Sequence, residues 1–206
     1  MSIMKVLTDI VKPRHLDTVS KDLETFIGQI KSQMEYGGVK YKANKDGKES
    51  TDVLFDTFGP NWVIGTICKY VFRLTNVGRS KDALKIATYC YILWLKRGFY
   101  VIPSGIDSPA LPTNLKVKSD NFELFMEYIR KNFVTFRKET ARQRVKELET
   151  IKAHLINWSQ KEFNTITEQE LYDVFMLIAS YWMSNFDATD TDTDVWNETN
   201  GVKPTK

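Results

Sequence analysis

Apolar residues recur at intervals of three and four along most of the chain, and this spacing predicts helices. The repeat is clearest over residues 16–34, 63–74, 83–94, 122–136, 145–158 and 171–182. We therefore predict an all-α protein. It should be a helical bundle with a central antiparallel helix hairpin and a long C-terminal helix.

The central hairpin is predicted from residues 58–98, which read as two helices joined by a short turn at 76–79. Pro60 stands near the start of the first helix, and Gly98 lies just past the end of the second. Ser80 is the expected N-cap of the second helix, with Asp82 in its first turn. The predicted apolar faces are Val63, Ile67, Tyr70 and Leu74 on the first helix, and Ala83, Ile86, Ala87, Cys90 and Trp94 on the second.

Changes in composition divide the chain into four predicted parts. Residues 1–98 form an N-terminal helical domain, and the proline-containing segment 99–118 reads as a linker. Residues 119–186 form a C-terminal helical region in which Thr167 and Glu170 make a capping box for the last helix. Residues 187–206 are acidic and low in complexity, so we predict a disordered tail.

Residues 119–158 contain neither glycine nor proline. They predict one long helix, or two helices with a bend around Thr140. A helix of that length often reaches outside its own domain, so its apolar stripe predicts a homo-oligomer.

Positive charge is concentrated in the hairpin. Between Asn61 and Gly98 there are seven basic residues and one acidic residue, whereas the whole chain carries a net charge of only +3. This concentration favours an anionic ligand. The alternative is that these side chains are simply solvated on amphipathic helices, and the two interpretations have about equal weight.

The hairpin contains the pattern Gly65-x-x-x-Lys69-Tyr70-x-x-Arg73, then a turn with Gly78, and then Asp82-x-x-Lys85-x-x-x-Tyr89. With this pattern it resembles a small phage family otherwise labelled as of unknown function, one podophage member of which is a nucleotide kinase that lacks a P-loop. Upstream, the segment Tyr36-Gly37-Gly38-Val39-Lys40-Tyr41 is similar to one in phage dATP/dGTP diphosphohydrolase-like and MazG-like proteins. Both resemblances imply a ligand with nucleotide phosphates, and together they cover about residues 34 to 98.

The glycine pair Gly37-Gly38 has two interpretations. It would stop the preceding helix, and a simple helix stop explains it on its own. It would also leave backbone amides free to approach a ligand, with Lys40 and Tyr41 beside them.

Three cations of the hairpin are suited to holding phosphates by side chains. Lys69 and Arg73 lie four residues apart on one helix face, and Lys85 on the antiparallel partner would complete a clamp. Tyr70 and Tyr89 would stack on a base or a ribose, although tyrosines at helical spacing are more often core residues. Asp82 would position Arg73 or Lys85 by a salt bridge.

Asp52 and Asp56 lie four apart on a predicted short helix over 51–58, so they share a face. They are the best candidates for a Mg²⁺ site, because this ion prefers oxygen ligands alongside substrate phosphates. The alternative is that they are surface acids near a helix start.

Two functions follow from these features. The first is a phage-encoded enzyme of nucleotide metabolism that transfers or hydrolyses phosphate, similar to a nucleotide kinase or a nucleoside triphosphate pyrophosphohydrolase. The second is a non-catalytic binder of a nucleotide signal, or a helical inhibitor of a host factor. The paired acidic motifs of MazG-like enzymes are missing from the sequence, which favours the second. Nucleic acid is not the favoured partner.

The compartment is predicted from cysteines and hydropathy. Cys68 and Cys90 both fall within apolar helical patterns, so we expect buried thiols in a reducing cytoplasm. A zinc site or a disulfide scaffold is not expected. No apolar run approaches the roughly 20 residues of a membrane span.

Overall fold

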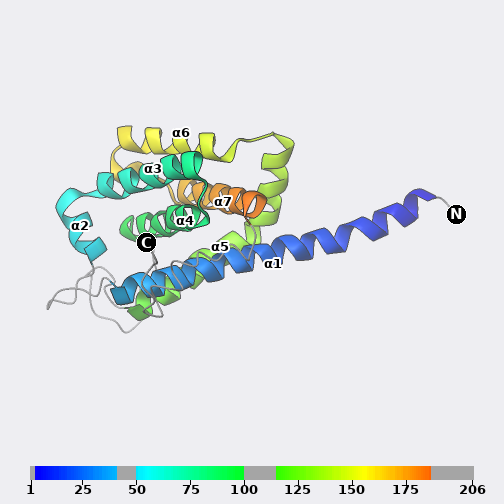
Figure 1. The fold of residues 1–206 in the computed structure, drawn as a ribbon, viewed down its shortest axis with the longest axis horizontal. Helices are drawn as coiled ribbons and strands as arrows, with labels where there is room; N and C mark the ends of the chain where they lie inside the picture. The colour runs from blue at the N-terminus through cyan, green and yellow to red at the C-terminus, as the bar shows by residue number, and fades with distance from the viewer. Residues whose placement is uncertain (1–2, 41–49, 100–114, 187–206) are drawn as a thin grey trace, which may run out of the picture.

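The computed structural model describes the backbone of residues 3–40, 50–99 and 115–186, and the side chains of 18–36, 50–99 and 121–186. This part of the chain consists of helices without a strand, so the predicted all-α fold is confirmed (Figure 1). The predicted tail, Tyr41 and most of the predicted linker lie outside it. The helices are α1 (Ile3–Lys40), α2 (Ser50–Phe58), α3 (Pro60–Val77), α4 (Ser80–Lys96), α5 (Leu115–Arg142), α6 (Glu147–Gln160), the 3-10 helix η1 (Phe163–Thr165) and α7 (Glu168–Asn185).

Helices α3 and α4 form the predicted hairpin. Gly78 adopts a left-handed conformation with φ of 67°, and its N–H donates to the Leu74 carbonyl at 3.1 Å, which ends α3. The N-cap of α4 is Arg79 instead of the predicted Ser80. The Ser80 hydroxyl accepts a buried hydrogen bond from Trp182 Nε1 at 2.8 Å, so it joins α4 to α7 instead of capping the helix.

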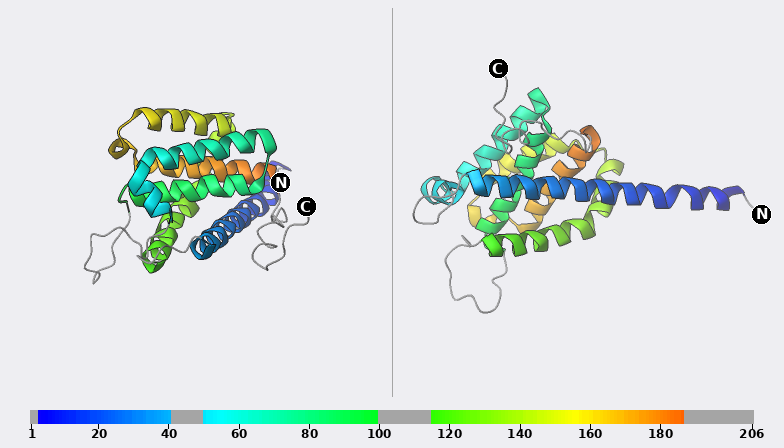
Figure 2. Two further views of the ribbon diagram at one scale, coloured as in Figure 1. Left: turned by 60° about the vertical axis from the view of Figure 1, so that its left-hand side comes forward. Right: turned by 60° about the horizontal axis from the view of Figure 1, so that its bottom comes forward.

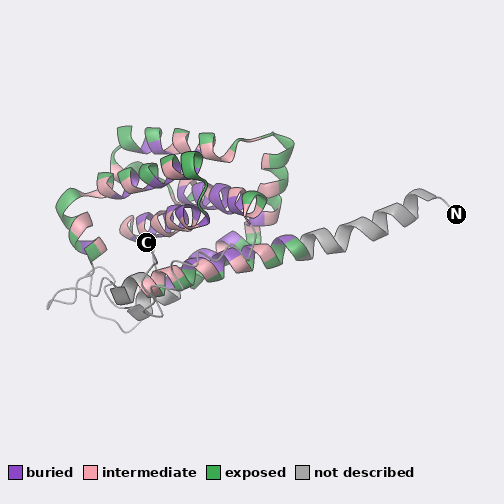
Figure 3. Cartoon of the chain, in the orientation of Figure 1, coloured by how far each residue is buried: buried purple, intermediate pink, exposed green. Residues whose placement is uncertain are grey.

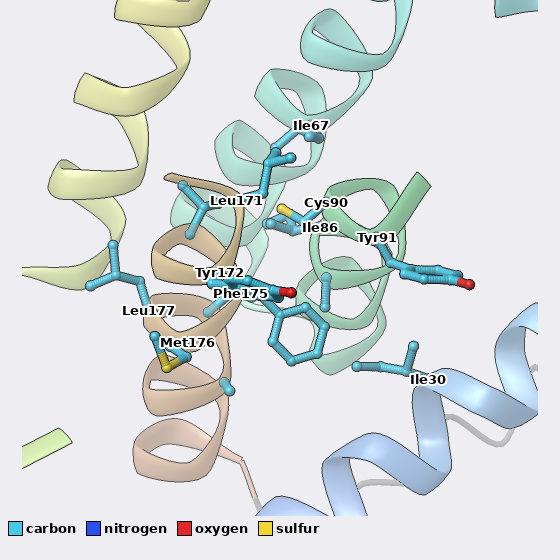
Figure 4. Packing of buried hydrophobic residues seen from close by; sticks show 14 of the residues in the cluster. Ile30, Ile67, Ile86, Cys90, Tyr91, Leu171, Tyr172, Phe175, Met176 and Leu177 are labelled. Carbon is cyan, nitrogen blue, oxygen red and sulfur yellow. The ribbon is translucent and has the colours of Figure 1, made fainter. Parts of the chain in front are cut away.

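The bundle is built around α4 and α7, with α3 and α6 packed on one side and α1 and α5 on the other (Figures 1 and 2). Helix α7 is buried almost all round, since every residue from Val174 to Ser180 is buried (Figure 3). In Figure 4, Ile86 and Cys90 of α4 face Leu171 and Phe175 of α7. One hydrophobic core therefore draws residues from both sides of the predicted linker.

The predicted stop of α1 at Gly37-Gly38 is wrong. Helix α1 continues through both glycines to Lys40, and it begins at Ile3, well before the apolar repeat that starts at residue 16. A glycine costs only about 1 kcal/mol in a helix interior, which other contacts can outweigh. Upstream, α1 is held to the bundle by fully buried residues such as Phe26 and Ile30. None of the described helices, α1 included, is apolar over a length that could cross a membrane.

A break separates α5 from α6, so residues 119–158 form two helices and not one long helix. Arg144 is left-handed with φ of 53°. Its N–H donates to the Ala141 carbonyl at 3.1 Å, and the Val145 N–H donates to the Thr140 carbonyl at 2.9 Å. This hydrogen-bond pair is a Schellman motif, which usually has glycine at the left-handed position.

The apolar stripe of α5 packs inside its own chain. Phe125, Ile129 and Phe133 are fully buried, and α5 packs against α1 and α7. The stripe is therefore covered within the chain, and the predicted homo-oligomer stays a prediction without this surface to support it. The helix also begins at Leu115, before the predicted start at residue 119.

The two cysteines differ in their surroundings. Cys90 is fully buried in the core, as predicted, and this burial raises the pKa of its thiol. Cys68 is exposed on α3, so the prediction that it is a core residue is wrong. Partial burial still raises the pKa of the Cys68 thiol, although its own backbone hydrogen bond opposes the shift.

Candidate functional site

Three cations converge on the ring of Tyr70. Measured to the ring centroid, Lys85 Nζ lies at 5.0 Å, Lys69 Nζ at 5.5 Å and Arg73 Cζ at 5.8 Å. Lys69 and Arg73 come from α3, and Lys85 comes from α4. Each separation is within the range of a cation–π contact. The structure thus brings together the three side chains that the sequence proposed as a clamp, and we call them the cation cluster.

Aromatic packing in the seam between α3 and α4 fixes the position of Tyr70. Tyr70 is buried and stacks on Tyr89, with ring centroids 6.0 Å apart and an interplanar angle of 18°. Tyr89 meets the edge of Trp62 at 5.9 Å. Tyr89 therefore supports the Tyr70 ring, and the Tyr70 ring contacts the three cations. This arrangement differs from the base-stacking role expected for them.

Asp82 lies behind the cation cluster, in the first turn of α4. Its side chain is fully buried, and Oδ2 lies 3.4 Å from Nε of Arg73, which is one third exposed. Neither carboxylate oxygen of Asp82 has a hydrogen bond among the described residues. The contact is therefore an ion pair without good hydrogen-bond geometry, and it links Arg73 to α4 as the sequence suggested.

The cation cluster lies at the surface of the hairpin. Lys69 is exposed and Lys85 is half-buried, whereas the carboxylate of Asp82 is inaccessible. The formal charges of these two lysines, Arg73 and Asp82 sum to about +2. The N-terminus of α4 adds a partial positive charge, because its first amides have no partner within the helix. The arrangement can bind an anion and neutralise it.

Two other cations of the hairpin have structural roles that the sequence did not reveal. Lys96 Nζ pairs with Asp52 Oδ1 at 2.7 Å, and both side chains are more than nine-tenths buried. Arg97 donates to the carbonyls of Ile166 at 2.8 Å and Asn164 at 2.7 Å. Two of the seven basic residues of the hairpin, Lys96 and Arg97, therefore tie α4 to α2 and to the α6–α7 connection. The partners are far away in sequence, so no local signal predicts them.

The proposed metal ligands lie at the other end of the hairpin. Lys96, the partner of Asp52, is eleven residues beyond Lys85 on the same helix, which corresponds to about 16 Å. Asp56 is exposed on α2. The described residues contain no group of three or more side chains arranged to hold a metal ion. Magnesium binding at Asp52 and Asp56 stays a prediction, and such a site would be separate from the cation cluster.

The predicted glycine-pair site is not next to the cation cluster either. Gly37, Gly38 and Lys40 belong to the last turns of α1, where backbone amides bond within the helix. Figure 1 shows this end of α1 near the start of α2, whereas the α3–α4 turn lies at the end of α3 that is away from α2. The predicted contact of these residues with the hairpin ligand therefore loses its geometric basis.

A second polar cluster was not predicted from the sequence. Oε1 of Glu168 accepts hydrogen bonds from Trp94 Nε1 at 2.8 Å and from the Tyr172 hydroxyl at 2.7 Å. Tyr172 also stacks on Tyr128, with ring centroids 3.8 Å apart. Desolvation, followed by the bond to Glu168, raises the pKa of Tyr172. The cluster joins the start of α7 to α4 and α5, so we assign it to the fold.

Comparison of the chain with protein-family models, curated proteins and solved structures gives no match. The resemblance to the phage nucleotide kinase and to MazG-like proteins therefore stays a prediction. The feature of the described residues that points to a function is the cation cluster.

Proposed function

We propose that the protein binds a nucleotide through its phosphates at the cation cluster. The observation that carries the proposal is the convergence of Lys69, Arg73 and Lys85 within 5.0 to 5.8 Å of one buried ring. Cations held near one another repel, and an anion between them relieves the repulsion. A phosphate also suits the donors, since arginine can fork onto two oxygens while lysine acts as a point charge.

The packing around Tyr70 supports the proposal. Binding costs less conformational entropy when the side chains of a site are already held in place before the ligand binds. Tyr70 and Tyr89 are packed in the helix seam, and Arg73 is tethered to the buried Asp82. Their rotamer freedom is already restricted before a ligand arrives. The exposed Lys69 can move to meet ligands of somewhat different length. A di- or triphosphate therefore fits this cluster better than a single isolated phosphate.

Phosphate transfer or hydrolysis is the catalytic form of this proposal. The cations would neutralise the charge that spreads over the phosphoryl oxygens, and catalysis would come from positioning and electrostatics. A non-catalytic binder is the second candidate. The position of Asp82 favours this second candidate, because the Asp82 carboxylate beside the cation cluster is fully buried and paired with Arg73. In that position it serves better as a counter-charge than as a base for an incoming nucleophile.

One experiment tests the binding and separates the two forms. The purified protein is titrated by calorimetry with ribo- and deoxynucleoside mono-, di- and triphosphates, with Mg²⁺ and with EDTA, and each mixture is analysed by chromatography. Saturable binding that tightens from mono- to triphosphate supports the site, and new nucleotide species would show catalysis. Binding with every nucleotide recovered intact would establish the non-catalytic form. No saturable binding of any phosphate compound would reject the proposal.

A further inference from the structure

Phe72 is the most exposed of the large hydrophobic residues that the structure describes. It is 70% exposed, in the middle of α3, on a helix whose inner face is well buried. Its ring has no aromatic or cation–π partner among the described residues. An exposed, unpaired aromatic ring on a rigid helix is a ready stacking surface.

The position of Phe72 relative to the cation cluster gives this ring a specific use. Phe72 is three residues after Lys69, and residues at this spacing are neighbours on a helix surface. At about 100° per residue, Tyr70 lies to one side of Lys69 and Phe72 to the other. Lys69 therefore separates the phosphate side, which faces α4, from the aromatic side. Along α3, Lys69 and Phe72 are separated by about one helical turn, a length that the sugar of a nucleotide can bridge.

The other aromatic residues of the site cannot offer the same surface. Tyr70 is buried under the cations, and one of its faces is covered by Tyr89. Tyr89 in turn meets both Tyr70 and Trp62. Phe72 is thus the ring next to the cluster that is free to receive a base.

We infer that Phe72 is the base-stacking residue of the cation cluster, so that phosphates bind Lys69, Arg73 and Lys85 while the nucleobase stacks on the Phe72 ring. This inference rests on the proposed function and narrows the ligand class from phosphate compounds to nucleotides. Stacking on an aromatic face tolerates different bases, because every base has a π-face. Asn76, one turn further on, is exposed and donates to the Phe72 carbonyl at 2.7 Å. Its amide oxygen can accept a hydrogen bond from a base edge.

The test compares a nucleoside triphosphate with inorganic tripolyphosphate, which has the phosphates but no base. Both are titrated by calorimetry into the wild type, F72L and the control V77A, which alters another exposed apolar residue of α3. We expect F72L to bind the nucleoside triphosphate about tenfold more weakly and tripolyphosphate as tightly as the wild type does. V77A should bind both compounds with the affinity of the wild type. Sedimentation velocity on each variant measures its self-association.

Each other outcome overturns the inference in a recognisable way. Equal binding of both compounds to the wild type would mean that no base is recognised. If F72L weakened the binding of both compounds equally, Phe72 would act by holding the cations in place and not by stacking on a base. A loss of self-association in F72L would assign the ring to an interface between copies of the chain. If neither compound binds the wild type, the cation cluster itself fails, and the proposed function fails with it.

Discussion

Arg73 of α3 and Asp82 of α4 form an ion pair across the turn that joins the two helices, with Nε and Oδ2 3.4 Å apart. The carboxylate is fully buried, and the guanidinium is one third exposed. Arg73 therefore has two roles, since it neutralises a buried charge and presents its remaining donors to solvent. A variant at Arg73 must be tested for stability before its effect on binding is interpreted.

Arg73→Ala is expected to lower the free energy of unfolding by about 1 to 3 kcal/mol, because it leaves the Asp82 carboxylate buried without a counter-charge. Adding D82N should recover most of this loss, since the double variant buries no charge. Urea unfolding of the wild type, both single variants and the double variant gives the coupling energy. Losses that simply add would show that the two side chains do not interact.

Two lysines of the basic hairpin should differ sharply in their effect on stability. K96M removes the partner of the buried Asp52 and is expected to cost about 3 kcal/mol. K69M alters an exposed side chain and should change the free energy of unfolding by less than about 0.5 kcal/mol. Chemical denaturation of both variants checks this. Similar losses in the two variants would contradict the distinction between the structural cation and the ligand-binding cation.

The capping box of α7 should make stability depend on pH. Burial of the Glu170 carboxylate acts to raise its pKa, but the Thr167 N–H, Lys161 and the Thr167 hydroxyl together lower it below the ordinary value. A lowered pKa in the folded state stabilises the fold above the unfolded-state pKa, and this stabilisation is lost as the pH falls through the folded-state pKa. We therefore expect wild type to exceed E170Q in stability near neutral pH.

That difference should shrink as the pH falls below the ordinary glutamate value of 4.5. Urea unfolding of both proteins at about pH 7 and about pH 3 measures it. Glutamine keeps the side-chain shape and can still accept the Thr167 N–H bond, so the comparison isolates the charge. A constant difference at all pH values would mean that the charge of Glu170 contributes nothing.

Arg144→Gly is expected to stabilise the protein by about 0.5 to 1 kcal/mol. Arg144 is left-handed at φ of 53°, a conformation that costs a side-chain-bearing residue about 1 to 2 kcal/mol. Part of this gain is offset by the greater freedom of glycine in the unfolded chain. Gly78→Ala serves as the opposite control, because it adds a side chain at φ of 67° and should destabilise. Thermal unfolding of both variants tests the pair, and a destabilised R144G would contradict the account.

The sequence predicted those parts of the fold that depend on one helix at a time. The buried positions of α3 and α4, among them Ile67 and Ile86, follow from the 3.6-residue period because each helix buries one face. The capping box at Thr167 and Glu170 was also predictable, since both partners lie within one helical turn. The convergence of Lys69, Arg73 and Lys85 followed from the antiparallel hairpin, which sets the facing residues.

What the sequence could not predict depends on partners far away in the chain or on backbone conformation. The pairing of Lys96 with Asp52 spans 44 residues and converts an apparent surface cation into a buried one. Arg144 ends α5 in a conformation that glycine usually adopts, so no glycine or proline in the sequence decided between one helix and two. Conversely, Gly37 marked a break that does not occur, because propensity is a weak signal beside tertiary packing.

The most direct test of the central claim is calorimetric titration of a nucleoside triphosphate into K69M/K85M. Each substitution removes a charge of the cation cluster without touching the Arg73–Asp82 pair. The matched control is K131M/K138M, which removes two exposed lysines of α5. We predict that K69M/K85M weakens binding by about tenfold or more, while the control binds as wild type does. Equal affinity in K69M/K85M and in wild type would contradict the proposal that these side chains hold the phosphates.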